Sequence, residues 1–294
     1  MADHSGQAKA ALAALTGAAL IGLAPIAIRV SEVGAHATNL WRFLFALPIL
    51  AVWAAASKPA AAPGQALLLL GAGLMFGMEI SLWAAALGLT TVANATLLVN
   101  LTPVFAAAIG WLWFKERIGV VVLGGGVTAL AGAAILAMAR AQANGGPAAD
   151  DAQGVLGDTL AFSGAVLYAG YLLIVRGLGK SVSVGSVMFW GTLAATAVAA
   201  AASFWSGETM LPQTLPGWAL LAGLGVFVQV GGQGLIAYGV GRLPIVISTV
   251  LLWMQPLVAA ALSWIMFGEA LGPLAFAGAA LILAGIYVVQ RHRA

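Results

Sequence analysis

Long, mainly apolar stretches follow one another along almost the whole chain, and they restrict its fold more than any other feature. The first, residues 10–28, contains no charged side chain and ends at Arg29. A helix needs roughly 20 consecutive apolar residues to cross the hydrocarbon core of a bilayer. Charged residues and Gly/Pro turns divide the chain into ten such stretches: 10–28, 38–56, 66–87, 93–114, 118–139, 157–176, 183–205, 217–239, 244–266 and 271–290. We therefore expect an all-α, multi-pass membrane protein with ten transmembrane helices.

The small share of charged residues agrees with this expectation. Of the 294 residues, 62% are hydrophobic and 7% are charged, whereas a soluble protein carries about 25% charged residues. Most of the surface must therefore face lipid. The net charge of +3 does not indicate nucleic-acid binding, because the basic residues lie singly along the chain. The chain has no cysteine, and His4, His36 and His292 form no His-x-x-x-His pair, so we expect no metal site and no cofactor.

Lysine and arginine are distributed unevenly between the loops. With the N-terminus in the cytoplasm, the inner segments hold nine of them: Lys9, Lys58, Lys115, Arg117, Arg176, Lys180, Arg242, Arg291 and Arg293. The outer loops hold two, Arg29 and Arg140, and Arg42 lies within the second span. Cytoplasmic loops of membrane proteins carry an excess of Lys and Arg. The distribution therefore predicts that both termini are cytoplasmic and that the number of spans is even.

The chain contains an internal repeat. Residues 94–132 match residues 247–285 without gaps at an offset of 153. The matched pairs are Thr96/Thr249, Pro103/Pro256, Trp111/Trp264, Phe114/Phe267, Glu116/Glu269, Gly119/Gly272, Gly125/Gly278 and Gly132/Gly285. Chance similarity between alanine-rich helices explains apolar matches but not proline, tryptophan, Phe-x-Glu and glycines in one register. We therefore predict a first five-helix repeat at 8–140, an outer linker at 141–154 and a second repeat at 155–294. The paired glycines predict close helix packing.

Five spans in each repeat is an odd number, so the two repeats must be inverted in the membrane. The charges agree, because the inner segment 114–117 contains Lys115 and Arg117, whereas both cations are missing from its counterpart at 267–270, which would lie outside. Inverted repeats place a substrate site at their interface near the middle of the membrane, and rocking of one repeat against the other gives alternating access. The organisation thus predicts a secondary transporter and not an enzyme.

The repeated pattern of a proline in the fourth span, a following Phe-x-Glu and a glycine-rich fifth span resembles the EamA domain pair. That pair defines the ten-helix branch of the drug/metabolite transporter superfamily. A weaker likeness, to the YddG-type amino-acid exporters, lies in residues 78–88 and 164–171. The resemblance covers essentially the whole chain. It implies export of small metabolites, with aromatic and other zwitterionic amino acids among them, across a bacterial inner membrane.

Glu79 is the acidic residue that lies deepest within a predicted span, about 13 residues into 66–87. The burial of a charged carboxylate at this depth costs roughly 3 kcal/mol unless it is paired, protonated or hydrated. We expect it to face a cavity and to hold a substrate ammonium group or to exchange a proton. A structural carboxyl bonded to a neighbouring helix is the alternative. Trp83, four residues later, lies on the same helix face and would contact the apolar part of a substrate.

Arg42 lies about one turn inside the outer end of the second span. Its guanidinium has three candidate roles, between which the sequence does not decide. These roles are binding of a substrate carboxylate through two hydrogen bonds, extension to the outer lipid headgroups, and pairing with Glu79.

Pro103 and Pro256 lie near the middle of equivalent spans, and we expect them to act as hinges. Each proline lacks an N–H group and frees the carbonyl four residues earlier, and broken helices tend to line hydrated cavities. A kink without substrate contact is the alternative. Four residues close to the freed carbonyls are therefore candidate substrate-binding residues: Asn100, Thr102, Trp253 and Gln255.

Two further pairs in the second half are candidates for the same site. Gln229 and Gln233 share a helix face at i+4, and Tyr168 and Tyr171 share one at i+3. Polar side chains within spans also bond one helix to another, which is the alternative.

The sequence thus favours an exporter of small zwitterionic metabolites, whose partners would be its substrate and membrane lipid. A multidrug exporter of hydrophobic cations is the alternative substrate class, because Glu79 and the aromatic residues would suit it equally. A membrane-embedded enzyme acting on lipids and a receptor or scaffold without transport are the alternatives from other classes. The sequence leaves open proton coupling and the choice between monomer and homodimer.

Overall fold

The computed structural model describes residues 4–86, 88–90, 95, 98–115, 119–144, 151–268 and 272–291. Throughout this part of the chain the regular elements are helices, so the prediction of an all-α fold is confirmed for it. The helices are α1 (His4–Ile21), α2 (Ala24–Val30), α3 (Ala35–Ala56), α4 (Pro63–Ala86), α6 (Thr102–Phe114), α7 (Val120–Asn144), α8 (Asp151–Leu178), α9 (Val184–Ser206), α10 (Leu215–Gly223), η1 (Leu224–Gln233), α11 (Gly234–Val240), α12 (Ile245–Leu251), α13 (Met254–Phe267) and α14 (Pro273–Arg291).

Within the described residues, seven helical stretches are long and apolar enough to cross a membrane. They are Gly6–Val30, Ala35–Ala56, Pro63–Ala86, Ala152–Leu178, Val184–Ser206, Leu215–Val240 and Ile245–Phe267. Three shorter apolar helices coincide with other predicted spans: Thr102–Trp113, Val120–Leu136 and Pro273–Val289. The chain is thus a multi-pass membrane protein, and the number of ten spans stays a prediction.

Some predicted features lie outside the described residues. They are the start of the fourth span (91–94, 96 and 97), Glu116 and Arg117 of the first Phe-x-Glu segment, Glu269 of its counterpart, and residues 145–150 of the linker.

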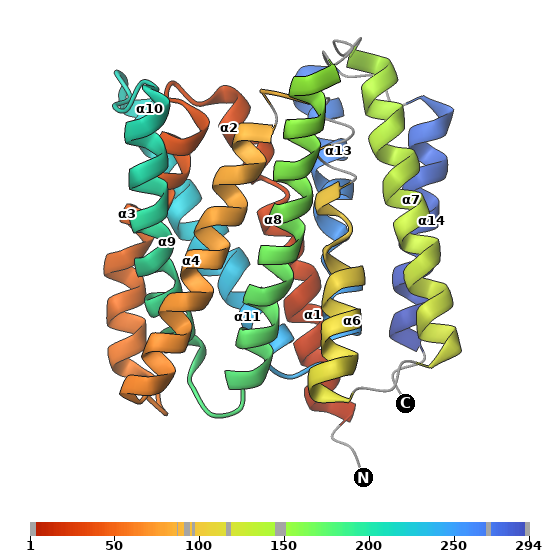
Figure 1. Ribbon diagram of the computed structural model, residues 1–294, viewed down its shortest axis with the longest axis horizontal. Helices are drawn as coiled ribbons and strands as arrows, with labels where there is room; N and C mark the ends of the chain where they lie inside the picture. Colours follow the sequence, from red (N-terminus) through yellow and green to blue (C-terminus); the bar gives the residue numbers. More distant parts are fainter. Residues whose placement is uncertain are drawn as a thin grey trace.

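Helices of the two halves of the chain pack against each other along the length of the bundle (Figure 1). Helix α3 packs on α9, α7 on α14, α4 on α8 and α9, and α1 on η1 and α11. The largest hydrophobic cluster lies between the halves and includes Phe43, Leu172 and Ile236, none of which is accessible to solvent. Helix α1 begins and α14 ends at the same end of the bundle (Figure 1).

Paired glycines bring α7 and α14 into backbone contact. A Cβ atom added at Gly132 would lie 2.6 Å from the carbonyl oxygen of Gly278, and one added at Gly278 would lie 2.8 Å from that of Gly132. Any side chain at these positions would push the helices apart, because cores are packed without spare volume. Gly125 and Gly285 make an equivalent contact. The predicted packing role of the four glycines is therefore confirmed.

Among the described residues, three helical stretches are interrupted shortly before a proline. Residues 22–23 separate α1 from α2 ahead of Pro25, and residues 252–253 separate α12 from α13 ahead of Pro256. Helix α6 begins after a turn at residues 100–101, one residue ahead of Pro103. A proline lacks the N–H group for the next intrahelical bond. The breaks expected from Pro103 and Pro256 are therefore present. In the span Leu215–Val240, the ten residues of η1 form a π-helix in place of α-helix, a geometry that is frequent at functional sites.

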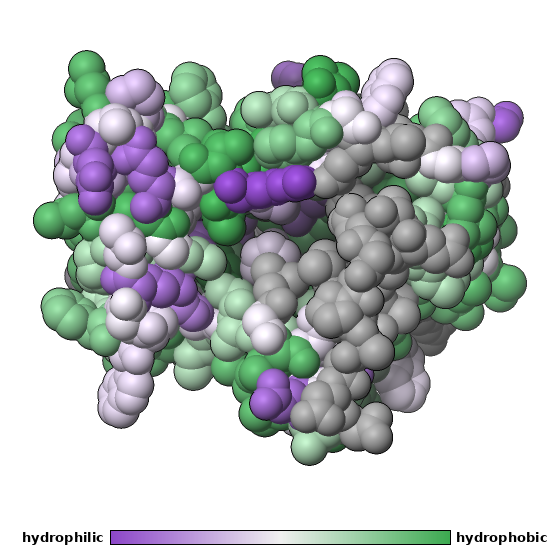
Figure 2. All heavy atoms as spheres, turned by 90° about the horizontal axis from the view of Figure 1, so that it is seen from above, coloured by the Kyte–Doolittle hydropathy of each residue, from purple (hydrophilic) through white to green (hydrophobic). Residues whose placement is uncertain are grey.

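At the upper end of Figure 1, each of two loops supplies a carboxylate that accepts hydrogen bonds from residues beside the other loop. Glu208 accepts a hydrogen bond from the N–H of His36 at the start of α3 (2.9 Å). Glu32 accepts hydrogen bonds from the hydroxyl of Thr214 and the N–H of Gln213 (2.8 Å), just ahead of α10. These bonds, the Thr214 hydroxyl first, hold the pKa of Glu32 below its ordinary value. Figure 2 looks onto this end and shows hydrophilic side chains on the side of α10.

Candidate functional site

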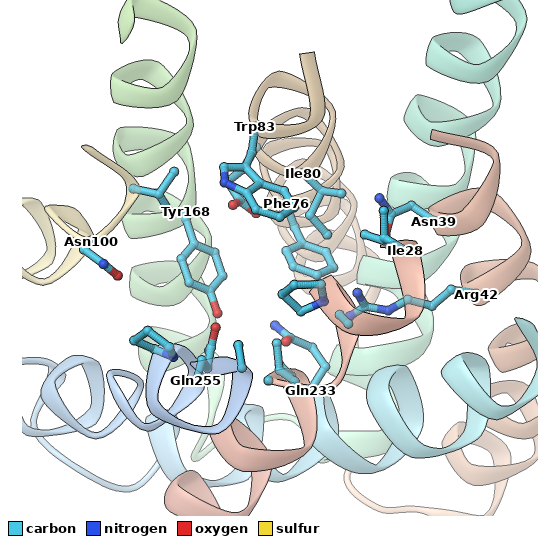
Figure 3. Close-up of a pocket in the computed structure, with 18 residues that line it drawn as sticks. Ile28, Asn39, Arg42, Phe76, Ile80, Trp83, Asn100, Tyr168, Gln233 and Gln255 are labelled. Carbon is cyan, nitrogen blue, oxygen red and sulfur yellow. The ribbon is translucent and has the colours of Figure 1, made fainter. Parts of the chain in front are cut away.

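A cavity of about 230 Å³ lies between α1/α2, α3, α4, α8, η1 and α13, and we call it the main cavity. It adjoins the interruption between α1 and α2 as well as Pro256 of α13. Figure 3 shows Arg42 and Tyr168 extending into it from opposite sides. Eight of the residues predicted from the sequence line it: Arg42, Glu79, Trp83, Asn100, Tyr168, Gln233, Gln255 and Pro256. The fold thus brings together residues from both halves of the chain.

Glu79 supplies a carboxylate to the main cavity. Its side chain is 8% exposed, so it lies inside the protein and not at the lipid surface. Gly164 of α8 faces it, and a Cβ atom at that glycine would lie 3.7 Å from the Cγ atom of Glu79. Among the described residues no side chain or backbone group donates a hydrogen bond to the carboxylate. Its oxygens are therefore available to a proton or to a cationic group in the cavity.

Arg42 lies inside the bundle and does not extend to the lipid headgroups, because its side chain is only 4% exposed. Its Nε donates a hydrogen bond to Oε1 of Gln229 (3.1 Å), and Nε2 of Gln229 donates to the hydroxyl of Thr192 (2.9 Å). This chain of bonds joins α3, η1 and α9. Gln229 therefore lies behind the cavity wall and fixes Arg42. Among the described residues no direct ion pair joins Arg42 to Glu79, although both line the cavity.

Aromatic rings form one wall of the main cavity. Tyr168 and Tyr171 stack with their ring centroids 5.8 Å apart, and Phe76 stacks on Tyr171 at 5.0 Å. Nε2 of Gln233 donates a hydrogen bond to the hydroxyl of Tyr171 (3.1 Å). Tyr171 does not line the cavity itself, so its hydroxyl holds Gln233 in place from behind. Oε1 of Gln233 is buried without a donor in the described part of the chain.

A second, smaller cavity of about 50 Å³ adjoins the main one, and we call it the side cavity. Thr102, Pro103 and Trp253, all predicted from the sequence, lie in its wall. The hydroxyl of Thr102 donates to the carbonyl oxygen of Val99 (2.7 Å), the carbonyl that Pro103 deprives of its usual donor. The side chain after the break thus satisfies the backbone group that the proline frees.

Several residues of the main cavity were not predicted. Asn39, Phe76 and Ile80 line it, as do residues around the break between α1 and α2, such as Pro25. Pro25 carried a usable signal, since it follows Gly22 within an otherwise apolar span. Phe76 and Ile80 carried none, because apolar residues inside a span are equally common on faces that contact lipid.

The described architecture and the cavity between the halves agree with the result of a family comparison. The sequence profile of the EamA-like transporter family matches residues 8–138 and again residues 155–291. The chain belongs to the EamA-like transporter family. The resemblance inferred from the repeated Pro and Phe-x-Glu pattern is therefore confirmed, and the chain is a transporter by family.

Two further similarities place this EamA-like transporter among known proteins. It is 26% identical over 213 residues to a protein of Streptantibioticus cattleyicolor described as "Probable terminal-alkyne amino-acid exporter". That match covers 68% of this chain and 64% of the relative's length. A solved crystal structure has the same fold, with a TM-score of 0.81 over 97% of this chain and 98% of that chain at 20% identity.

Proposed function

We propose that this EamA-like transporter exports small zwitterionic metabolites, amino acids among them, across a bacterial inner membrane by alternating access. The observation that carries the proposal is the main cavity, which is lined by a carboxylate without a hydrogen-bond donor among the described residues and by a fixed guanidinium. A zwitterion carries the two charges that such a pair would complement. The exporter description of the Streptantibioticus relative supports the same substrate class.

In this proposal Glu79 binds the substrate ammonium group, because a buried carboxylate that has no hydrogen-bond donor among the described residues is stabilised by a cation in the cavity. Trp83 and Tyr168 offer apolar and aromatic surface to the rest of the substrate. Arg42 contributes the compensating positive charge, held in position by Gln229.

The proposed architecture is ten spans in two inverted five-helix repeats, with both termini in the cytoplasm. The packing supports this arrangement, because each of the main contacts between the halves joins equivalent helices or has a counterpart in which the two halves change places. Helices α3 and α9 correspond to each other in the repeat, as do α7 and α14, and each pair is in contact. The contact of α4 with α8 is likewise matched by that of α1 with η1 and α11. Pro103 and Pro256 would serve as hinges at equivalent breaks.

The charge of Glu79 provides the test. Glu79→Gln keeps the shape of the side chain but removes the charge, and a hydrogen bond to a charged group contributes about 1.5–3 kcal/mol. The affinity for amino acids should therefore fall roughly tenfold to a hundredfold. Counterflow of labelled amino acids and uptake driven by a proton gradient are measured side by side in proteoliposomes. Glu208→Gln, which neutralises a carboxylate in a loop away from the cavity, is the control.

The two assays separate the roles of Glu79. Loss of affinity in counterflow indicates ammonium binding. Normal counterflow with loss of gradient-driven accumulation indicates that Glu79 carries the coupling proton. Wild-type behaviour in both assays would contradict the assignment of Glu79.

A hydrophobic cation is the second candidate substrate, favoured by the aromatic wall of Phe76, Tyr168 and Trp83 beside Glu79. Transport of such cations without transport of any amino acid would identify a multidrug exporter instead.

A further inference from the structure

The side cavity lies where two helices begin. Its wall includes residues 99, 100, 102 and 103, around the start of α6, and residues 252, 253, 255 and 256, around the start of α13. It shares Asn100, Tyr168 and Gln255 with the main cavity, so the two spaces adjoin. In Figure 3 the ring of Tyr168 points toward Gln255, and both residues line both cavities. A substrate in the main cavity can therefore place one of its groups in the side cavity.

The backbone at both breaks is already satisfied by the protein. The hydroxyl of Thr102 donates to the carbonyl oxygen of Val99 (2.7 Å) and to that of Ala165 (3.4 Å). At the second break, the N–H of Gln255 donates to the carbonyl oxygen of Leu252 (3.0 Å). The carbonyls freed by the two prolines thus require no donor from a ligand.

Two side-chain donors in the same wall have no acceptor in the part of the chain that the structure describes. Trp253 is 3% exposed, and its Nε1 is buried without a hydrogen-bond partner among the described residues. Nδ2 of Asn100 is likewise buried and without an acceptor in that part of the chain. Buried donors in native proteins are nearly always paired with the protein, water or a ligand. Both donors therefore indicate that the side cavity holds an acceptor group.

The charge distribution favours the same kind of group. Helix N-termini carry partial positive charge, and those of interrupted membrane helices commonly face anionic groups of substrates. The described residues that line the side cavity include no Asp, Glu, Lys or Arg, so no side-chain charge opposes or replaces this effect. A volume of about 50 Å³ is enough for a few non-hydrogen atoms, since one water needs roughly 10–15 Å³ on the same scale.

We propose that the side cavity binds an oxygen acceptor group of the substrate, with a carboxylate as the best fit, through Nε1 of Trp253 and Nδ2 of Asn100. This assignment rests on the proposed transport of zwitterions and deepens it, because it adds a site for direct hydrogen bonds to an acceptor group beside the charges of Glu79 and Arg42 in the main cavity. The group comes from the main chain of an amino acid or from the end of its side chain, and the two sources share the same chemistry.

The test uses the full-length protein in proteoliposomes and measures competition against counterflow of a labelled amino acid. Leucine is compared with 3-methylbutylamine, which is leucine without its carboxylate, and glutamine is compared with norleucine. Trp253→Phe keeps an aromatic ring, although a smaller one, and removes the indole N–H donor. The wild-type preference for leucine or for glutamine should fall by roughly tenfold or more in this variant, because hydrogen bonds to charged or buried groups contribute factors of this size.

The comparison that changes identifies the source of the acceptor group. Loss of preference for leucine over the amine assigns the main-chain carboxylate, and loss of preference for glutamine over norleucine assigns a side-chain group. Asn100→Leu should act in the same direction and decides the question if Trp253→Phe does not fold. Trp190→Phe removes an indole N–H that lines neither cavity, and it should leave both ratios unchanged.

Wild-type ratios in both Trp253→Phe and Asn100→Leu would overturn the assignment, as would an equal change in Trp190→Phe. The proposed function would remain in either case. Absence of amino-acid counterflow in the wild-type protein would instead contradict the proposed function, and this assignment would fall with it.

Discussion

Replacement of Gln229 by leucine should destabilise the protein, because Arg42 on another helix loses its hydrogen-bond acceptor. Arg42 is 4% exposed, and the hydrogen bond from its Nε to Gln229 measures 3.1 Å. Leucine fills a similar volume but cannot accept this bond. A hydrogen bond to a charged group contributes about 1.5–3 kcal/mol, and a buried charge that loses its acceptor keeps its desolvation cost. We therefore expect the free energy of unfolding to fall by about 1.5–3 kcal/mol.

A graded series of variants separates this effect from simple loss of packing. Thr192→Val removes only the neutral bond from Gln229 (2.9 Å) and should cost about 0.5–1.5 kcal/mol. Gln213→Leu makes the same change of residue type at an exposed position just ahead of α10 and should stay within about 0.5 kcal/mol of the wild type. The double variant Arg42→Leu/Gln229→Leu removes both partners, and its cost should be less than the sum of the single costs by more than about 0.5 kcal/mol.

The assay is titration of SDS into protein held in a second detergent, with tryptophan fluorescence reporting the folded fraction. A Gln229→Leu variant within about 0.5 kcal/mol of the wild type would refute the reasoning. Strict additivity in the double variant would do the same, because it would show that Gln229 does not act on Arg42.

Two further predictions concern the ends of the bundle. The pKa of Glu32 is lowered from 4.5 by hydrogen bonds from Thr214 and Gln213, so this contact stabilises the fold above about pH 4.5 and is lost as the pH falls through the lower folded-state pKa. The difference in melting temperature between wild type and Glu32→Gln should therefore shrink between pH 7 and pH 4, and a difference independent of pH would contradict this. A fluorescent protein fused after Ala294 should report the cytoplasm, and a tag within 145–150 should be labelled from outside; protection of that tag would contradict the inverted repeats.

The spans and the breaks within them were largely predictable from the sequence. Membrane insertion depends on the summed apolarity of a stretch about 20 residues long, which is a local property. The effect of Pro103 and Pro256 is local as well, because a proline always removes the same intrahelical bond. The glycine pairs Gly132 and Gly278 were readable because only small residues allow two backbones to approach so closely. These features depend on a residue and its chain neighbours. The prolines and glycines also occur at matching positions in both halves of the sequence, which strengthened the prediction.

Only the tertiary structure decided which polar groups meet. Gln229 and Gln233 share a helix face in the sequence, yet one fixes Arg42 from behind and the other lines the main cavity. Trp253 was a candidate because it follows the carbonyl that Pro256 frees, but the sequence does not show that its Nε1 is buried without an acceptor among the described residues. Such partnerships depend on how each helix is rotated about its axis and on the irregular turn of η1. Both are set by packing against helices from the other half of the chain, so no local pattern in the sequence encodes them.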